Sequence, residues 1–207
     1  MNDKPASTKE SVIAAARVLF VRFGHAKTSV EEIAREAGLS KATVYNHFDG
    51  KEAIVAGVIE FERRAMMKKL LDTVGETSDP LEQLQAFFQT RVREVERHFK
   101  AYRAGKDDII KHMPQVARAI EDSRKEERSI IEGILKKGVK AGIFRPLEDI
   151  TLTADLLFTT LLGLTFPLFG RPVRRSLDKR AEALAVLFLV GICSDRSRSK
   201  NLNKEQT

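Results

Sequence analysis

The sequence predicts an all-α protein in two parts, an N-terminal group of three short helices and a larger C-terminal helical bundle. Apolar residues recur at spacings of three and four along almost the whole chain, as they do on one face of a helix. Glycine and proline separate these periodic segments, and no segment shows the alternation typical of a half-buried strand. The periodic segments indicate about nine helices.

The composition is that of an ordinary globular protein. The chain has 207 residues, of which 43% are hydrophobic and 31% charged. Its one cysteine, Cys193, rules out an intrachain disulfide and a multi-cysteine metal site, which favours a cytoplasmic location. The polar N-terminus lacks the apolar core of a secretory signal. Polar residues, glycine and proline interrupt the most apolar region, 156–169, so we expect a buried helix there and no membrane span.

The net charge of +7 suits a polyanionic partner but does not locate its binding site. Basic and acidic residues nearly balance within residues 1–50. Part of the excess lies in Arg171–Arg180 and in the tail after Cys193. For Arg171–Arg180 we favour a solvated loop between helices over a second nucleic-acid patch.

Two helices are expected before residue 38. The first covers Thr8–Phe23 and ends at Gly24, which suits the position after a helix C-terminus. The second begins after Ser29, because Ser29 and Glu32 have the spacing of a capping box. Its apolar residues form a stripe that faces the core.

A third, short helix is predicted over Lys41–Phe48. Gly38 permits the sharp turn before it, and Ser40 can cap its first turn. Val44 and Phe48 lie one turn apart and are expected to face inward.

The larger part begins with a long helix that starts near Lys51. Asp79, Pro80 and Glu82 combine an N-cap, a first-turn proline and a capping-box acid, so another helix begins there. The helices of this part are expected over 51–74, 80–99, 114–141, 149–169 and 176–192, with a less regular segment over 102–112. The domains are therefore 1–52 and 53–193, followed by a polar, disordered tail over 194–207.

The two short helices and the turn between them indicate a helix-turn-helix. In this motif the second helix lies in the major groove of DNA and presents its first residues to the bases. No acidic residue occurs between Ala37 and Phe48, as expected for a surface that approaches phosphates. The acids of the preceding helix are expected to point away from the DNA.

The stretch FGHAKTSVEEIAREAGLSKATVYNHFDGKEAI carries a family resemblance. With it, residues 11–55 resemble the N-terminal domain of the tetracycline-repressor (TetR) family of bacterial transcription regulators, over about a quarter of the chain. His25 departs from the aromatic residue common after the glycine, which leaves the packing role of this position open. Gly50 stands where serine is common, so Asp49 is the candidate cap there.

The resemblance implies two sets of DNA contacts. Phosphate contacts are implied for Thr28, Ser29, Tyr45, His47 and Lys51, and we add Ser40, whose alternative role is that of a helix cap. Base contacts are implied for Lys41, Ala42, Thr43 and Asn46. For Tyr45 and His47 the alternative is an exposed aromatic ring and a surface histidine.

The helices over 149–169 and 176–192 are apolar on most of their circumference, so they need cover on every side. A second copy of the chain, packed across a two-fold axis as a four-helix bundle, supplies that cover. The alternative is a monomer with a buried helical hairpin. The interface residues that we predict are Leu156, Leu162, Leu184, Leu187 and Val190. A homodimer of this kind reads a palindromic operator in double-stranded DNA.

The resemblance also implies a repressor that is released by a small molecule bound in the C-terminal domain. Candidate pocket residues are Leu84, Phe87, Phe88, Arg91, Val95, Tyr102, Met113 and Phe158, and plain core is the alternative for each. Because most of these side chains are apolar or aromatic, we expect an apolar or aromatic ligand. Tight binding alone would not release DNA, because the ligand must favour one of two states.

Other function classes find little support in the sequence. His98 and His112 have no metal-ligand spacing, and no nucleophile motif or phosphate-binding glycine loop occurs. We therefore predict no enzyme activity, no metal and no cofactor. Two rival interpretations are a ligand-independent or architectural DNA-binding protein and a helical enzyme or adaptor with a vestigial DNA-binding domain.

Overall fold

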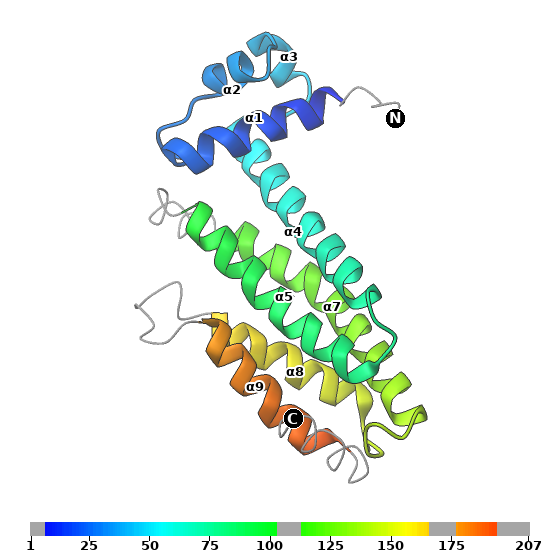
Figure 1. The fold of residues 1–207 in the computed structure, drawn as a ribbon. Helices are drawn as coiled ribbons and strands as arrows, with labels where there is room; N and C mark the ends of the chain where they lie inside the picture. Colours follow the sequence, from blue (N-terminus) through cyan, green and yellow to red (C-terminus); the bar gives the residue numbers. More distant parts are fainter. Residues whose placement is uncertain (1–6, 103–112, 166–176, 194–207) are drawn as a thin grey trace. The chain divides into compact units, whose positions relative to one another are not determined.

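The computed structural model describes residues 7–102, 113–165 and 177–193, which form eight α-helices (Figure 1). Their bounds are α1 Thr8–Phe23, α2 Val30–Glu36, α3 Lys41–Tyr45, α4 Lys51–Gly75, α5 Pro80–Ala101, α7 Met113–Lys140, α8 Ile150–Thr165 and α9 Leu177–Ile192. In these residues the only β-type pairing is an isolated bridge between Phe144 and Cys193, so the predicted all-α class is confirmed. All but Tyr102 of the less regular segment, 102–112, and all of the tail, 194–207, lie outside the described residues.

The N-terminal helix ends follow the predicted capping chemistry. Ser29 and Glu32 form the expected capping box, and Ser40 caps α3. A second capping box, formed by Ser7 and Glu10 at the start of α1, was not predicted, although the spacing of a serine and a glutamate signals it. Gly24 follows α1 with a φ of 81°.

The third helix is shorter than predicted, because α3 ends at Tyr45 and the chain then tightens into a turn. The amide of His47 donates to the Val44 carbonyl at 3.0 Å, as in a 3₁₀ turn, and the amide of Phe48 donates to the same carbonyl at 3.0 Å. Gly50, with a φ of 109°, then lets the chain reverse into α4.

The chain divides into two compact units. The first comprises Met1–Ala65 with His98–Glu121, and the second Met66–Arg97 with Asp122–Thr207. The predicted domain boundary after residue 52 therefore falls inside the first unit. The physical reason is that α4 buries Ile54, Val55 and Val58 in the apolar cluster of α1, α2 and α3.

The second unit has its own apolar core. Fully buried side chains of α5, α7 and α8, together with Phe144 from the loop after α7, make its centre: Leu84, Phe87, Phe88, Ile131, Leu135, Leu157, Phe158 and Leu161. The amide of Arg145 donates to the Ile192 carbonyl at 2.9 Å, which ties this loop to the end of α9.

Two glycines of α7 provide a matched stability test. A methyl group at Gly138 would overlap the buried ring of Phe144, whereas one at Gly133 would meet no atom within 4 Å. We expect Gly138→Ala to lower the free energy of unfolding by about 1–2 kcal/mol. Gly133→Ala should raise it by up to about 1 kcal/mol, because alanine has the higher helix propensity. Urea unfolding measures both changes, and shifts of the same sign would contradict the packing at Gly138.

Candidate nucleic-acid interface

The short helix α3 is held by one deeply buried side chain. Val44 has no exposed surface and belongs to the same apolar cluster as Ile33 of α2 and Val12 of α1. Phe48 packs against this cluster from the turn that follows. Since the anchor occupies one face of α3, the opposite face is left to solvent.

That opposite face carries the predicted base-reading residues. Lys41, Ala42 and Asn46 are exposed, and Tyr45 lies beside them at 47% exposure. Thr43 is half-buried, and its hydroxyl lies 2.8 Å from the Ser40 hydroxyl, which also accepts the Thr43 amide at 3.0 Å. The exposed face therefore offers an ammonium group, a methyl group, a phenol and an amide to a ligand.

One acidic side chain reaches this face, contrary to the expectation that the acids of α2 point away. The carboxylate of Glu31 forms an ion pair with the ammonium group of Lys41. This contact lowers the pKa of Glu31 and raises that of Lys41. Lys41 also lies 5.7 Å from the ring centroid of Tyr45. The ammonium group has three N–H donors, so those that Glu31 does not use remain for a base.

The residues predicted to contact phosphates differ in whether their donor groups are exposed or already hydrogen-bonded within the protein. His47 is exposed, and Lys51 is half-buried at the first position of α4. The backbone amide and the hydroxyl of Ser29 both donate to the Glu32 carboxylate, at 2.7 and 2.9 Å. These two donors reach a phosphate only if Glu32 releases them.

The hydroxyl of Thr28 is already engaged within the protein, which bears on the phosphate contact that the resemblance implies for this residue. It is 3% exposed, and its hydroxyl donates to the Gly24 carbonyl at 2.9 Å. The residue closes the loop between α1 and α2. His25, whose packing role was open, lies against Phe20 with ring centroids 5.5 Å apart in an edge-on arrangement.

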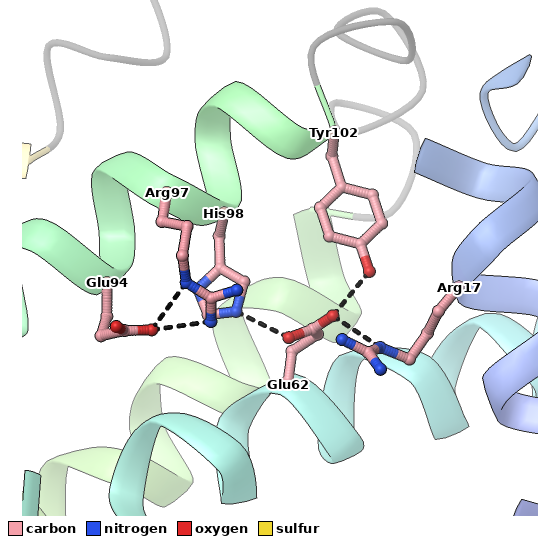
Figure 2. Close-up of polar contacts among 6 residues, drawn as sticks. All are labelled: Arg17, Glu62, Glu94, Arg97, His98 and Tyr102. Atoms are coloured by element: carbon pink, nitrogen blue, oxygen red, sulfur yellow. Dashed lines mark hydrogen bonds and ion pairs between the residues drawn. The ribbon is translucent and has the colours of Figure 1, made fainter. Parts of the chain in front are cut away.

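A polar cluster around Glu62 joins three helices within the first unit (Figure 2). Oε1 of Glu62 accepts from Arg17 Nε of α1 and from the Tyr102 hydroxyl, both at 2.8 Å. Oε2 lies 2.7 Å from Nε2 of His98 on α5, and this ring nitrogen must carry the proton because a carboxylate only accepts. Burial alone would raise the pKa of Glu62, but hydrogen bonds from His98, Arg17 and Tyr102 outweigh it and lower the pKa to about 2. Sequence reasoning missed this cluster.

The predicted pocket residues belong to different units. Leu84, Phe87, Phe88, Arg91, Val95 and Phe158 lie in the second unit, where all but Arg91 contribute to the apolar core. Tyr102 belongs to the first unit and packs against its apolar cluster. Met113 also belongs to the first unit, and its side chain lies outside the described residues. Tyr102 is therefore accounted for by the Glu62 cluster.

The predicted interface residues of α8 and α9 also separate into two groups. Leu156 and Leu187 are exposed, at 53% and 72%. Leu162 and Leu184 pack against the core of the second unit. The side chain of Val190 is not among those described.

The described residues contain neither a candidate metal-binding group nor a helix that could span a membrane. Within 7–102, 113–165 and 177–193, no group of three or more histidine, cysteine, aspartate or glutamate side chains is arranged to hold a metal ion. His98 contacts Glu62, and His112 lies outside these ranges. No helix in the same ranges is long and apolar enough to cross a membrane.

The sequence of the first unit matches a known family. Residues 12–58, which include α2, α3 and the start of α4, match the family model described as bacterial regulatory proteins, tetR family. These residues form a DNA-binding domain of the TetR family. The predicted resemblance is confirmed, and the protein is a DNA-binding transcriptional regulator.

The similarity extends beyond the DNA-binding part. The transcriptional repressor KstR2 of Mycobacterium tuberculosis is 29% identical over 147 residues, which cover 70% of this regulator and 74% of KstR2. A transcriptional regulator from Cytophaga hutchinsonii has the same fold, with a TM-score of 0.78, 24% identity and coverage of 91% and 100% of the two chains. The solved structure of KstR2, a ketosteroid transcriptional regulator, aligns with a TM-score of 0.54, 24% identity and coverage of 93% and 98%.

Proposed function

We propose that this regulator is a dimeric repressor that occupies a palindromic operator and is released by a small, apolar or aromatic ligand. The exposed face of α3 is the main observation that supports DNA binding. The buried side chain of Val44, on the opposite face, anchors this helix to the protein. Repression is supported by KstR2, a relative that is named a transcriptional repressor. A repressor binds a particular DNA sequence, and the exposed face of α3 carries side chains that can contact bases.

The proposed base contacts are made by Lys41, Ala42, Thr43 and Asn46. Asn46 can pair with adenine through two hydrogen bonds, and Lys41 can donate to guanine through a donor that Glu31 does not use. The proposed phosphate contacts come from Ser29, Tyr45, His47 and Lys51. Ser40 contributes as the cap of α3, because its hydroxyl already accepts the Thr43 amide.

The proposed dimer forms through α8 and α9. Leu152 and Leu156 lie one turn apart on α8 with exposed side chains, and Val186 and Leu187 are exposed on α9. Large exposed apolar side chains on neighbouring turns often mark a protein–protein interface. A second copy with the same two helices would cover them across a two-fold axis.

The proposed ligand site lies in the second unit, among α5, α7 and α8. Release requires that the ligand favour a state in which the recognition helices no longer fit the operator. Helices α4 and α5 each contribute residues to both units. We propose that a change of packing in the second unit shifts these helices and so alters the Glu62 cluster.

The test of the proposed function is selection of tight binders from a random DNA duplex pool at near-physiological salt, with the full-length protein. A palindrome with half-sites about one helical turn apart, or slightly more, is the expected result. Recovery of no consensus, with binding that still weakens as salt rises, would overturn the repressor and support a DNA-binding protein without sequence preference.

Two substitutions on α3 separate base reading from phosphate binding. Asn46→Ala should reduce discrimination at particular base pairs by about 1–3 kcal/mol, because it removes a base contact. Tyr45→Phe should weaken binding to all sequences alike, because it removes a phosphate contact. Fluorescence anisotropy with the selected palindrome and single-base variants of it measures both. An unchanged base preference in Asn46→Ala would exclude Asn46 from the base-reading set.

A further inference from the structure

A buried ion pair links α5 and α7 in the second unit. Nε of Arg91 donates to Oε2 of Glu127 at 2.8 Å, and the two side chains are 5% and 0% exposed. Moving two charges out of water is costly, and apolar side chains of similar volume often serve stability as well or better. We therefore expect this buried ion pair to have a role other than stability.

The pair also leaves hydrogen-bonding capacity unused. Nη1 of Arg91 and Oε1 of Glu127 are buried and have no hydrogen-bond partner. Buried polar atoms are normally satisfied, so two such atoms in one ion pair are unusual. The pair between Arg124 and Asp155 in the same unit contrasts with it, because both carboxylate oxygens accept from the guanidinium at 2.9–3.1 Å.

Buried apolar side chains lie one turn from each member of the pair, together with the buried Ser123, one turn before Glu127. Phe87 and Phe88 lie one turn before Arg91 on α5, and Ile131 lies one turn after Glu127 on α7, all fully buried. Burial raises the pKa of Glu127, and the Arg91 guanidinium opposes this increase. A molecule that reaches the two unused atoms must bury an apolar body against these side chains.

We infer that Arg91 and Glu127 bind the neutral polar end, a hydroxyl or carboxamide, of an otherwise apolar ligand. A hydroxyl can accept from Nη1 and donate to Oε1 at the same time, and a carboxamide offers the same two functions. A carboxylate would meet the negative charge of Glu127, and an ammonium group the positive charge of Arg91. This inference rests on the proposed ligand site and specifies its chemistry.

The test uses four probes with one aromatic body, namely 2-naphthol, 2-naphthamide, naphthalene and 2-naphthoate. Isothermal titration of the full-length protein should give affinities for the naphthol and the naphthamide at least about tenfold above those for the other two. No binding by any probe, or equal affinity for all four, would overturn the inference and leave an ordered water as the partner of the two atoms.

Two variants assign the preference to the pair. Arg91→Met combined with Glu127→Leu replaces it by apolar side chains, so the preference for the naphthol should disappear while the protein keeps its Tm. Glu127→Gln alone removes the negative charge, so affinity for 2-naphthoate should rise about tenfold. Arg124→Gln, at the satisfied pair, is the control and should leave the preference intact. A preference that survives in the double variant, or a naphthoate affinity unchanged in Glu127→Gln, would contradict the inference.

Operator binding by the wild-type protein separates this inference from the proposed function. If the protein binds a palindrome but shows no preference among the probes, the chemistry inferred for Arg91 and Glu127 is wrong and the repressor proposal stands. If the naphthol binds with the expected preference but leaves operator affinity unchanged, the ligand site stands and release by a ligand is wrong.

Discussion

The combined substitution Leu156→Glu and Leu187→Glu should make the regulator monomeric and weaken its binding to the selected palindrome by at least about 100-fold. Both side chains are exposed, at 53% and 72%, on the helices that we propose form the dimer. In a dimer these positions would bury four carboxylates against apolar surface, and each buried charge without a partner is costly.

The loss of affinity follows from the loss of the second recognition helix. In a dimer, binding of one half-site places the other α3 at a high effective concentration near the second half-site. A monomer makes only one set of base and phosphate contacts. Its binding should therefore show a smaller salt dependence as well, because fewer phosphates are neutralised.

Analytical ultracentrifugation measures the oligomeric state, and fluorescence anisotropy measures operator affinity. Leu71→Glu is the matched control, since Leu71 is 55% exposed on α4, a helix that is not part of the proposed interface. This control should stay dimeric and bind the operator as the wild type does. If the double variant remains a dimer, the interface does not lie on α8 and α9.

The helix-turn-helix was predictable because its signals are local. A serine three residues before a glutamate, a glycine at a sharp turn and apolar residues at helical spacing all act within one or two turns of chain. Ser29, Ser40 and Gly38 could therefore be assigned without knowledge of distant contacts. The end of α3 was placed too late, since Phe48 continues the apolar spacing although the chain has already tightened into a turn.

The polar clusters were not predictable because their members are far apart in sequence. Glu62 lies in a run of charged residues on α4 that reads as a solvated face, yet it contacts Arg17 and His98, 45 and 36 residues away. Arg91 was singled out as a polar pocket candidate, but its partner Glu127, 36 residues later, was not. The contact between Glu31 and Lys41 was not predicted either, because no local pattern signals it.

The burial of Thr28 shows the same limit for a residue taken from a family resemblance. A hydroxyl at a helix start suits a phosphate, and that chemistry led to its inclusion. In the fold this hydroxyl donates to Gly24 inside the loop. Residue type and position favoured a phosphate contact, but the buried hydroxyl already donates to a backbone carbonyl of its own loop.

Glu62→Ala should lower the free energy of unfolding by about 3 kcal/mol, more than the loss of an ordinary surface ion pair. It removes the one carboxylate that accepts from Arg17, His98 and Tyr102 (Figure 2). The Glu62 side chain is 13% exposed, so water replaces only part of these contacts. Urea unfolding of the full-length protein at neutral pH measures the loss.

The same carboxylate should make the stability fall in acid. The pKa of Glu62 is lowered from 4.5 to about 2 in the folded protein, so the unfolded chain takes up this proton first as the pH falls. The stability that Glu62 contributes is therefore fully present above about pH 4.5 and is lost between pH 4.5 and 2. Glu62→Gln cannot ionise, so its stability should fall less steeply than that of the wild type across this window.

Glu60 supplies the control for this pH dependence. Its pKa is also lowered to about 2, first by a hydrogen bond from Arg63, although burial opposes the shift. Its partners, Arg63 and Arg64, lie within one turn of the same helix, and its side chain is 36% exposed. Because such pairs contribute at most about 1 kcal/mol, Glu60→Gln should leave most of the acid dependence in place. If Glu62→Gln instead loses stability in acid as steeply as the wild type, the Glu62 cluster does not link α1, α4 and α5 as the structure indicates.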